Sequence, residues 1–280
     1  MPDYDRPDED CLAFKAQGLK HYHVIRLNDR IATEGRADRN AEFPYLGLSP
    51  EDFAGRRVLD VGANDGALSF NAERAGAVDV VAVDIEDPAH QDWGFSGPPT
   101  SFQEQGQVRG STFEALKTFF ASGVTRKQKT VYDLSAAEDG QFDIAFFYGL
   151  LYHLRHPLLA FDRLRGVCRG ALCVETHVSN HEPYLPMTLF YGDDVLRGSD
   201  SNWTGPSEAC VAAWMRDAGF PTVYAELKPR VRNRQRFVGF VGDPVFAVNP
   251  KTFRVLDEAY FAKVHAECAR KIELGGLWRG

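Results

Sequence analysis

Apolar segments alternate with amphipathic segments through the middle of the chain. The apolar segments are short and rich in β-branched and aromatic residues, which is typical of buried strands. Five strands are predicted, at Arg57–Gly62, Val78–Ile85, Thr130–Leu134, Phe142–Gly149 and Ala171–His177. Helical patterns fit between them at Ala67–Arg74, Phe113–Ala121 and Leu158–Val167. This alternation predicts an α/β fold with a parallel, doubly wound sheet.

The pattern after residue 206 predicts the edge of the same sheet. A helix at Ser207–Ala218 ends at Gly219, a residue that suits a helix C-terminus. The strands Thr222–Leu227 and Phe237–Val241 leave no room for a helix between them, so they are expected to form an antiparallel hairpin. The fold predicted is a Rossmann-like, doubly wound sheet of seven strands, mostly parallel, with an antiparallel C-terminal edge hairpin.

Both ends of the chain extend beyond this core. Residues 1–50 are expected to form an N-terminal extension with a hairpin at His21–Thr33, and residues 246–280 a C-terminal helix, at about Thr252–Glu273. Residues 51–245 are expected to form the core domain between them. Residues 88–111 and 193–206 lack periodicity, which predicts binding loops or disorder.

Composition narrows the class of protein. The 280 residues, 44% hydrophobic and 25% charged, suit a globular protein with one large domain. A net charge of -7 gives no general attraction to phosphate backbones and weighs against an RNA-binding role. The five cysteines are scattered without a CxxC pair, which indicates free thiols in a reducing compartment. The acidic start MPDYDRPDED is unlike a signal peptide and no apolar run reaches membrane length, so a cytoplasmic location is expected.

The sequence DVGANDG, Asp60–Gly66, carries the first sign of a ligand site. Gly62 permits a tight turn after a strand, and Gly66 would let the backbone approach a ligand closely. The dinucleotide fingerprint G-x-G-x-x-G needs glycine where Asn64 stands, and Asp60 inside the strand is foreign to that pattern. The turn therefore indicates a nucleotide-like cofactor other than NAD, with a ligand-free glycine turn as the alternative.

Two further acids follow predicted strands. Asp84 ends the second strand about 20 residues after the glycine turn, the spacing at which an acid meets ribose hydroxyls. Its alternative role is to cap a helix. Asp133 follows the third strand, where it can accept a hydrogen bond from an adenine amino group or cap the turn that follows.

Longer motifs make the interpretation specific. They are GLLYHLRHPL at Gly149–Leu158, Glu175-Thr176 at a strand end, SNWTGP at Ser201–Pro206 and AGF at Ala218–Phe220. With D-x-G-x-x-x-G, they resemble class I S-adenosylmethionine (SAM) methyltransferases of the branch that acts on the tRNA wobble uridine. The likeness covers about residues 20–242. From the turn and the resemblance, the expected cofactor-binding residues are Asp60, Gly62, Asn64, Gly66, Asp84, Ile85, Asp133, Leu134, Tyr148 and Tyr152.

The resemblance leaves two cofactors open. In the branch that carboxymethylates tRNA the cofactor is carboxy-SAM, whose extra carboxylate meets a lysine, a tyrosine and an arginine. Tyr152 matches the tyrosine, whereas Lys15 or Lys20, and Arg234 or Arg236, match only loosely by position. The basic run Lys228–Arg236 is more simply a solvated hairpin loop, so SAM is favoured over carboxy-SAM.

Methyl transfer to a hydroxyl needs a positioned nucleophile and a base. His153 and His177 follow or end predicted strands and are expected to face the crevice, with Glu175 on the same rim. With Tyr152 they are the candidate catalytic residues. A structural role, such as buttressing the cofactor, remains the alternative for each.

Three other residues have weaker claims. His21 and His23 are spaced as metal ligands can be, but no third ligand is evident, so no metal site is predicted. Trp203 is expected either to wall the substrate pocket or to anchor its loop.

The expected function is SAM-dependent methyl transfer to an O, N or S nucleophile of a small molecule. The alternatives are a tRNA wobble-uridine methyl- or carboxymethyltransferase, and a SAM-binding regulatory protein without turnover.

Overall fold

The computed structural model describes residues 3–87, 90–92, 100–179, 182–191 and 201–275. Of the two predicted loops, residues 88–89, 93–99 and 193–200 lie outside the described residues. The loop prediction is wrong for residues 100–111, which belong to a helix at Thr100–Phe119, and for Thr204–Pro206, which forms a short strand. Within the described residues, no helix combines the length and the apolar character needed to cross a membrane.

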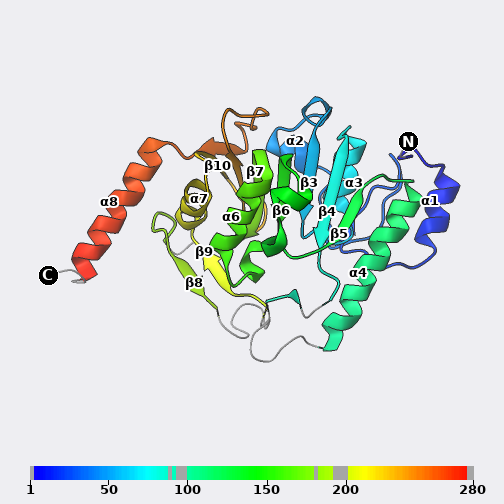
Figure 1. The fold of residues 1–280 in the computed structure, drawn as a ribbon, viewed down its shortest axis with the longest axis horizontal. Helices are drawn as coiled ribbons and strands as arrows, with labels where there is room; N and C mark the ends of the chain where they lie inside the picture. The colour runs from blue at the N-terminus through cyan, green and yellow to red at the C-terminus, as the bar shows by residue number, and fades with distance from the viewer. Residues whose placement is uncertain (1–2, 88–89, 93–99, 180–181, 192–200, 276–280) are drawn as a thin grey trace.

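One sheet of eight strands organises the fold (Figure 1). Its order is β12-β10-β11-β7-β6-β3-β4-β5, and β7, β6, β3, β4 and β5 are parallel. The remaining three strands are antiparallel to their neighbours, so the prediction of a mostly parallel, doubly wound sheet with an antiparallel C-terminal edge is confirmed. The bounds are β3 Arg57–Val61, β4 Asp79–Asp84, β5 Thr125–Gln128, β6 Phe142–Tyr148, β7 Cys168–His177, β10 Thr222–Glu226, β11 Arg234–Phe240 and β12 Phe253–Val255.

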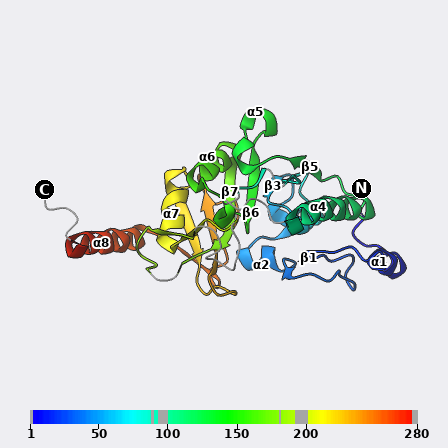
Figure 2. The same ribbon diagram turned by 90° about the horizontal axis from the view of Figure 1, so that it is seen from below.

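Helices cover both faces of this sheet (Figure 2). The helices are α1 Asp8–Lys15, α2 Glu42–Leu46, α3 Ala67–Arg74, α4 Thr100–Phe119, α5 Ala136–Asp139, α6 Pro157–Val167, α7 Glu208–Asp217 and α8 Glu258–Gly275. The apolar core on one face includes Val58 and residues of α1 to α4, and the core on the other includes Leu59 and residues of α6, α7 and α8. Successive strand residues are therefore buried on opposite faces, which explains the unbroken apolar runs in the sequence.

The third predicted strand is displaced along the chain. Strand β5 lies at Thr125–Gln128, and Val131–Asp133 forms a 3₁₀ turn instead. Thr130 and Asp133 close that turn as a capping box, which competes with strand pairing. Because β5 is a polar edge strand, apolar patterning could not reveal it.

The segment of the predicted N-terminal hairpin, His21–Thr33, turns back on itself at residues 28–31, and the hairpin with its place in the domain division stays a prediction. His23–Val24 (β1) pairs in parallel with Ala37–Asp38 (β2). Between these strands the chain forms an antiparallel bridge, Arg26–Ala32, and the Leu27 and Thr33 N–H groups donate to the Ile31 and Ile25 carbonyl oxygens, each at 2.8 Å. The side chain of Asn28 accepts hydrogen bonds from the backbone N–H groups of Arg30 and Ile31, which closes the turn between Arg26 and Ala32.

The C-terminal helix begins later than expected. Residues Phe253–Val255 form β12, the eighth strand, and α8 begins at Glu258 and extends away from the sheet (Figure 1). A short antiparallel pair, β8 Thr188–Phe190 and β9 Thr204–Pro206, lies outside the main sheet. The division into residues 1–50, 51–245 and 246–280 stays a prediction.

Candidate functional site

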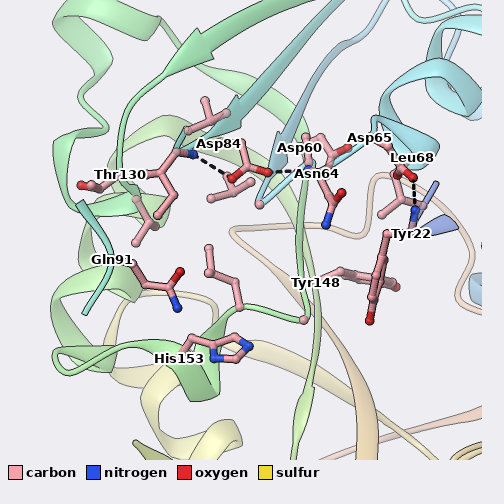
Figure 3. A pocket seen from close by; sticks show the side chains of 18 of the residues that line it. Tyr22, Asp60, Asn64, Asp65, Leu68, Asp84, Gln91, Thr130, Tyr148 and His153 are labelled. Atoms are coloured by element: carbon pink, nitrogen blue, oxygen red, sulfur yellow. Dashed lines mark hydrogen bonds between the residues drawn. The ribbon is translucent and has the colours of Figure 1, made fainter. Parts of the chain in front are cut away.

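A cavity of about 690 Å³ lies at the C-terminal ends of β3, β4 and β6 (Figure 3). Strand order reverses between β3 and β6, the position at which open α/β sheets bind ligands. Its walls come from the glycine turn after β3, the end of β4, residues 130–132, the loop after β6 and the N-terminal residues 20–23.

The glycine turn forms one wall of the cavity. Gly62 has a φ of +79°, and its N–H donates to the Val83 carbonyl oxygen at 2.8 Å. Asn64 also adopts a positive φ, +53°, and its backbone N–H donates to Asp84 Oδ2 at 2.5 Å. The Asn64 side-chain oxygen is buried and has no hydrogen-bond partner among the described residues. The turn is thus bound to β4 by hydrogen bonds from its backbone N–H groups.

Gly66 serves packing rather than ligand approach. It does not line the cavity, and its φ is +85°. A Cβ atom there would lie 2.6 Å from a ring carbon of Phe70 and 2.7 Å from one of Phe113. The aromatic core behind the turn therefore requires glycine at this position, which corrects the expected ligand-approach role.

Two expected carboxylates line the cavity. Asp84 is buried, and its Oδ1 accepts the Ile85 N–H at 2.7 Å (Figure 3); Ile85 also lines the wall. Asp60 is buried and accepts a hydrogen bond from Ser69 Oγ at 2.7 Å. Burial raises the pKa of Asp60 to about 6, so its charge responds to neighbouring groups.

Asp133 and Leu134 do not line the cavity. Asp133 accepts hydrogen bonds from Thr130 Oγ1 at 2.6 Å and Thr130 N at 3.1 Å, and the Thr130 hydroxyl lowers the pKa of the Asp133 carboxyl. Leu134 is buried in the core. The alternative of a turn cap is the one observed for Asp133, and Thr130, Val131 and Tyr132 form this wall instead.

Two tyrosines line the opposite part of the cavity. The Tyr148 hydroxyl lies 3.1 Å from Glu42 Oε1 and donates to it. The Tyr152 hydroxyl oxygen accepts a hydrogen bond from Arg234 Nη1 at 3.0 Å. Burial raises the pKa of both hydroxyls, so both remain protonated near neutral pH.

Of the two histidine candidates for a base, only His153 lines the cavity. Its Nδ1 lies 2.7 Å from the Ser201 carbonyl oxygen. A carbonyl can only accept, so Nδ1 carries the proton and the lone pair of the neutral ring is on Nε2. His177 lies outside the cavity lining, with Nε2 2.7 Å from the Tyr191 hydroxyl, so the expectation that it faces the crevice is wrong.

Glu175 lies behind the cavity wall rather than on its rim. It is buried, pairs through both oxygens with Arg234, and lies 3.2 Å from Arg39 Nη2. Although burial favours the neutral acid, the Arg234 pair lowers the pKa of Glu175, which therefore stays ionised. Its contact with Arg234 connects it to the Tyr152 hydroxyl.

Residues of the N-terminal segment are the part of the site that the sequence did not reveal. Asp65 Oδ2 accepts the backbone N–H group of Tyr22 at 2.8 Å (Figure 3). The same oxygen accepts the backbone N–H of His23 at 2.8 Å, and Oδ1 contacts His23 Nδ1. These bonds hold residues 20–23 against the glycine turn. No cluster of three potential metal-ligating side chains occurs among the described residues, and His23 is hydrogen-bonded to Asp65 instead.

The basic run Lys228–Arg236 is not wholly a solvated loop. Arg234 lines the cavity, and Arg236 is buried between Glu42 and Glu226. These two arginines alternate along β11 and so face the same side of the sheet. The interpretation as a solvated hairpin loop is wrong for both.

Trp203 anchors its segment. Its Nε1 donates to the Asp92 carbonyl oxygen at 2.7 Å, and its backbone N–H donates to the Tyr152 carbonyl oxygen at 2.8 Å. It is not among the residues that line the cavity, so the alternative of a loop anchor is the one observed.

Comparison with known proteins assigns the family. Residues 34–225 match the model of a methyltransferase domain, which is more than half of the chain. The chain belongs to this methyltransferase family. The tRNA U34 carboxymethyltransferase of Dichelobacter nodosus is 28% identical over 64% of this chain and 51% of its own length. That of Psychrobacter arcticus is 29% identical over 64% of this chain and 47% of its own length. The chain thus spans about half the length of the curated relatives it matches.

Solved structures share the fold of this methyltransferase. The N-terminal domain of EvdMO1, solved in the presence of SAH and D-fucose, superposes with a TM-score of 0.57 at 18% identity and covers 86% of this chain and 99% of that one. An O-methyltransferase family protein from Burkholderia thailandensis gives a TM-score of 0.50 at 15% identity, with 72% of this chain and 55% of that chain covered. Both likenesses concern the fold.

Proposed function

We propose that the protein is a SAM-dependent methyltransferase that transfers a methyl group to an O, N or S nucleophile of a small molecule. The observation that carries this proposal is the pair Asp84 and Asn64 at the ends of β4 and β3. Asp84 is held by two backbone N–H groups, and beside it the buried Asn64 oxygen has no partner within the described chain. Membership of the methyltransferase family supports the same reading.

The polar groups of this wall fit the cofactor. The Asp84 oxygens retain lone pairs that can accept from the two hydroxyls of a ribose. The Asn64 amide nitrogen points into the cavity and can donate a hydrogen bond to the ligand (Figure 3). A cationic ligand group beside Asp60 would favour its ionised form, whose pKa burial raises to about 6. Gly62, Ile85 and residues 130–132 complete the wall.

The residues of the other wall support the transfer chemistry. When bound, SAM would supply an electrophilic methyl group: a nucleophile that attacks the methyl carbon in line breaks its bond to the sulfonium sulfur, and S-adenosylhomocysteine is the leaving group. His153 is the proposed base, because the Ser201 carbonyl fixes its ring with the lone pair on Nε2. The Tyr152 oxygen accepts a hydrogen bond from Arg234, so the Tyr152 hydroxyl can still donate its proton. We propose that it donates to the substrate and orients it. Glu175 acts as a positioning residue through Arg234.

The activity is tested by a product search. The protein is incubated with methyl-labelled SAM and a small-molecule cell extract, and products that gain one labelled methyl group are sought by mass. We expect a labelled product whose rate falls by about 10²-fold or more in His153→Asn. His265→Asn, an exposed histidine on α8, is the matched control and should keep the wild-type rate. Equal rates in both variants would remove His153 from the mechanism.

A second candidate is carboxymethyl transfer to tRNA with carboxy-SAM. Lys20, Tyr152 and Arg234 all line the cavity, and these include the residues that the resemblance implies for the extra carboxylate. The Arg234 charge is already balanced by Glu175, which favours SAM. A competition titration decides between them: tighter binding of carboxy-SAM than of SAM, with a carboxymethylated tRNA product, would establish the second candidate. The cytoplasmic location stays a prediction.

A further inference from the structure

The acidic groups of the cavity are already satisfied by the protein. Four carboxylates line it, and each accepts hydrogen bonds within the described chain: Asp60 from Ser69, Asp65 from Tyr22 and His23, Asp84 from Asn64 and Ile85, and Asp92 from Tyr132 and Arg155. These four carboxylates therefore have hydrogen-bond donors without a Lys or Arg side chain of the cavity wall.

Three of the cavity's cations are also paired. Arg39 and Arg234 share Glu175, and Lys129 Nζ lies 2.9 Å from Asp139 Oδ2. Lys20 and Arg36 differ. Both line the cavity and both are exposed, and among the side chains that the structure describes neither has an ion pair or a side-chain hydrogen bond. The cavity wall thus carries two cations without a counter-charge from the described residues.

Both cations belong to the N-terminal layer. The Arg36 N–H donates to the Tyr22 carbonyl oxygen at 2.8 Å, so the segments that carry Arg36 and Lys20 lie side by side. Asp65 ties this layer to the glycine turn. In Figure 3, Tyr22 lies at the end of the cavity away from Thr130 and Gln91. The two cationic side chains therefore line the N-terminal side of the cavity, away from the wall that residues 130–132 form.

We propose that this side of the cavity binds a carboxylate or phosphate group of the small-molecule methyl acceptor, with Arg36 and Lys20 as its cationic ligands. A guanidinium offers two parallel donors that match a carboxylate or a phosphate, and an ammonium adds a point charge. The net charge of the chain is -7, so its surface as a whole does not attract anions. Binding of an anion therefore depends on the local positive charge of Lys20 and Arg36. The acceptor assignment rests on the proposed function, which places the cofactor at Asp84.

The test uses inorganic phosphate as the probe of the anion site. The full chain is saturated with SAH, and phosphate is titrated at constant ionic strength with chloride as the balancing anion, followed by calorimetry. We expect saturable phosphate binding that weakens by about tenfold or more in the double variant Lys20→Gln/Arg36→Gln. Arg163→Gln, an exposed arginine of α6 away from the cavity, is the matched control and should bind phosphate as the wild type does. Both mutated side chains are exposed, and a melting curve confirms that the variants fold.

Three outcomes would overturn the acceptor proposal. The first is the absence of saturable phosphate binding, or equal binding by wild type and the double variant. The second is a loss of SAH or carboxy-SAM affinity in the double variant, since the cations would then hold a carboxylate of the cofactor. The third is tight tRNA binding that depends on the same two residues, because the anion would then be an RNA phosphate. A wild-type protein that binds no SAH would instead refute the proposed function, so the two failures are distinguishable.

Discussion

Removing the Asp65 carboxylate should release the N-terminal wall of the site. Asp65 is 1% exposed, and it accepts hydrogen bonds from the Tyr22 N–H, the His23 N–H and the His23 ring. Asp65→Ala leaves three donors without their acceptor. An unsatisfied buried donor costs about 1–3 kcal/mol, and because Tyr22 is half exposed, water can replace part of the loss. The lower end for each donor gives about 3 kcal/mol in all.

Amide hydrogen exchange measures this loss directly. If the wall opens locally, about 3 kcal/mol corresponds to a fall of roughly 100-fold in the protection of the Tyr22 and His23 amides. The amides of β6, at the centre of the sheet, should keep their protection and serve as the internal control. Asp65→Asn retains one acceptor oxygen and should show a smaller fall. Unchanged protection at Tyr22 and His23 in Asp65→Ala would refute the proposed anchoring.

Three further changes have defined outcomes. Gly66→Ala should lower the free energy of unfolding in urea by about 2–4 kcal/mol, because it adds left-handed strain and crowds two phenylalanine rings; a loss below 0.5 kcal/mol would contradict this reason. Arg236→Met should lower the free energy of unfolding in urea by about 3–5 kcal/mol, because it leaves the buried Glu226 without its Arg236 partner and Glu42 to the more distant Arg39, at 3.7 Å; a loss below about 1 kcal/mol would contradict this reason. For Asp60, burial raises the pKa in the folded state from 3.8 to about 6, so its contribution to stability is present at low pH and is lost as the pH rises through both values. The free energy of unfolding of the wild type minus that of Asp60→Asn should decline by about 3 kcal/mol between about pH 3 and pH 7, and a flat difference would exclude it.

The local signals in the sequence indicated that the glycine turn and Asp84 lie at one edge of the sheet, and both line the same cavity. The turn after β3 and the acid at the end of β4 lie together because parallel strands end at one edge of the sheet. Asn64 and Asp84, 20 residues apart, are joined by a hydrogen bond. The closeness of such a pair follows from the strand lengths and the position of the turn, which the hydrophobic periodicity of the sequence predicts.

The other wall depends on contacts between distant segments. Glu175 pairs with Arg39, which is 136 residues away in the sequence. It therefore lies behind the cavity wall, although its position at the end of a strand predicts a place on the rim. His177 turns to Tyr191, and Asp133 caps its own turn. Periodicity cannot report which long polar side chains will pair, because pairing depends on tertiary packing rather than on spacing along one strand. For the same reason the sequence did not predict that Asp65 binds the backbone of Tyr22 and His23.

The most direct measurement of the proposed cofactor site is a calorimetric titration of the full chain with SAH and, separately, with NAD. We expect saturable one-site binding of SAH, no binding of NAD, and an SAH affinity reduced by about tenfold or more in Asp84→Asn, which keeps the side-chain size but loses one charged acceptor. Arg163→Gln should bind SAH as the wild type does. Binding of NAD without binding of SAH, or an SAH affinity unaffected by Asp84→Asn, would contradict the assignment of this cavity to SAM.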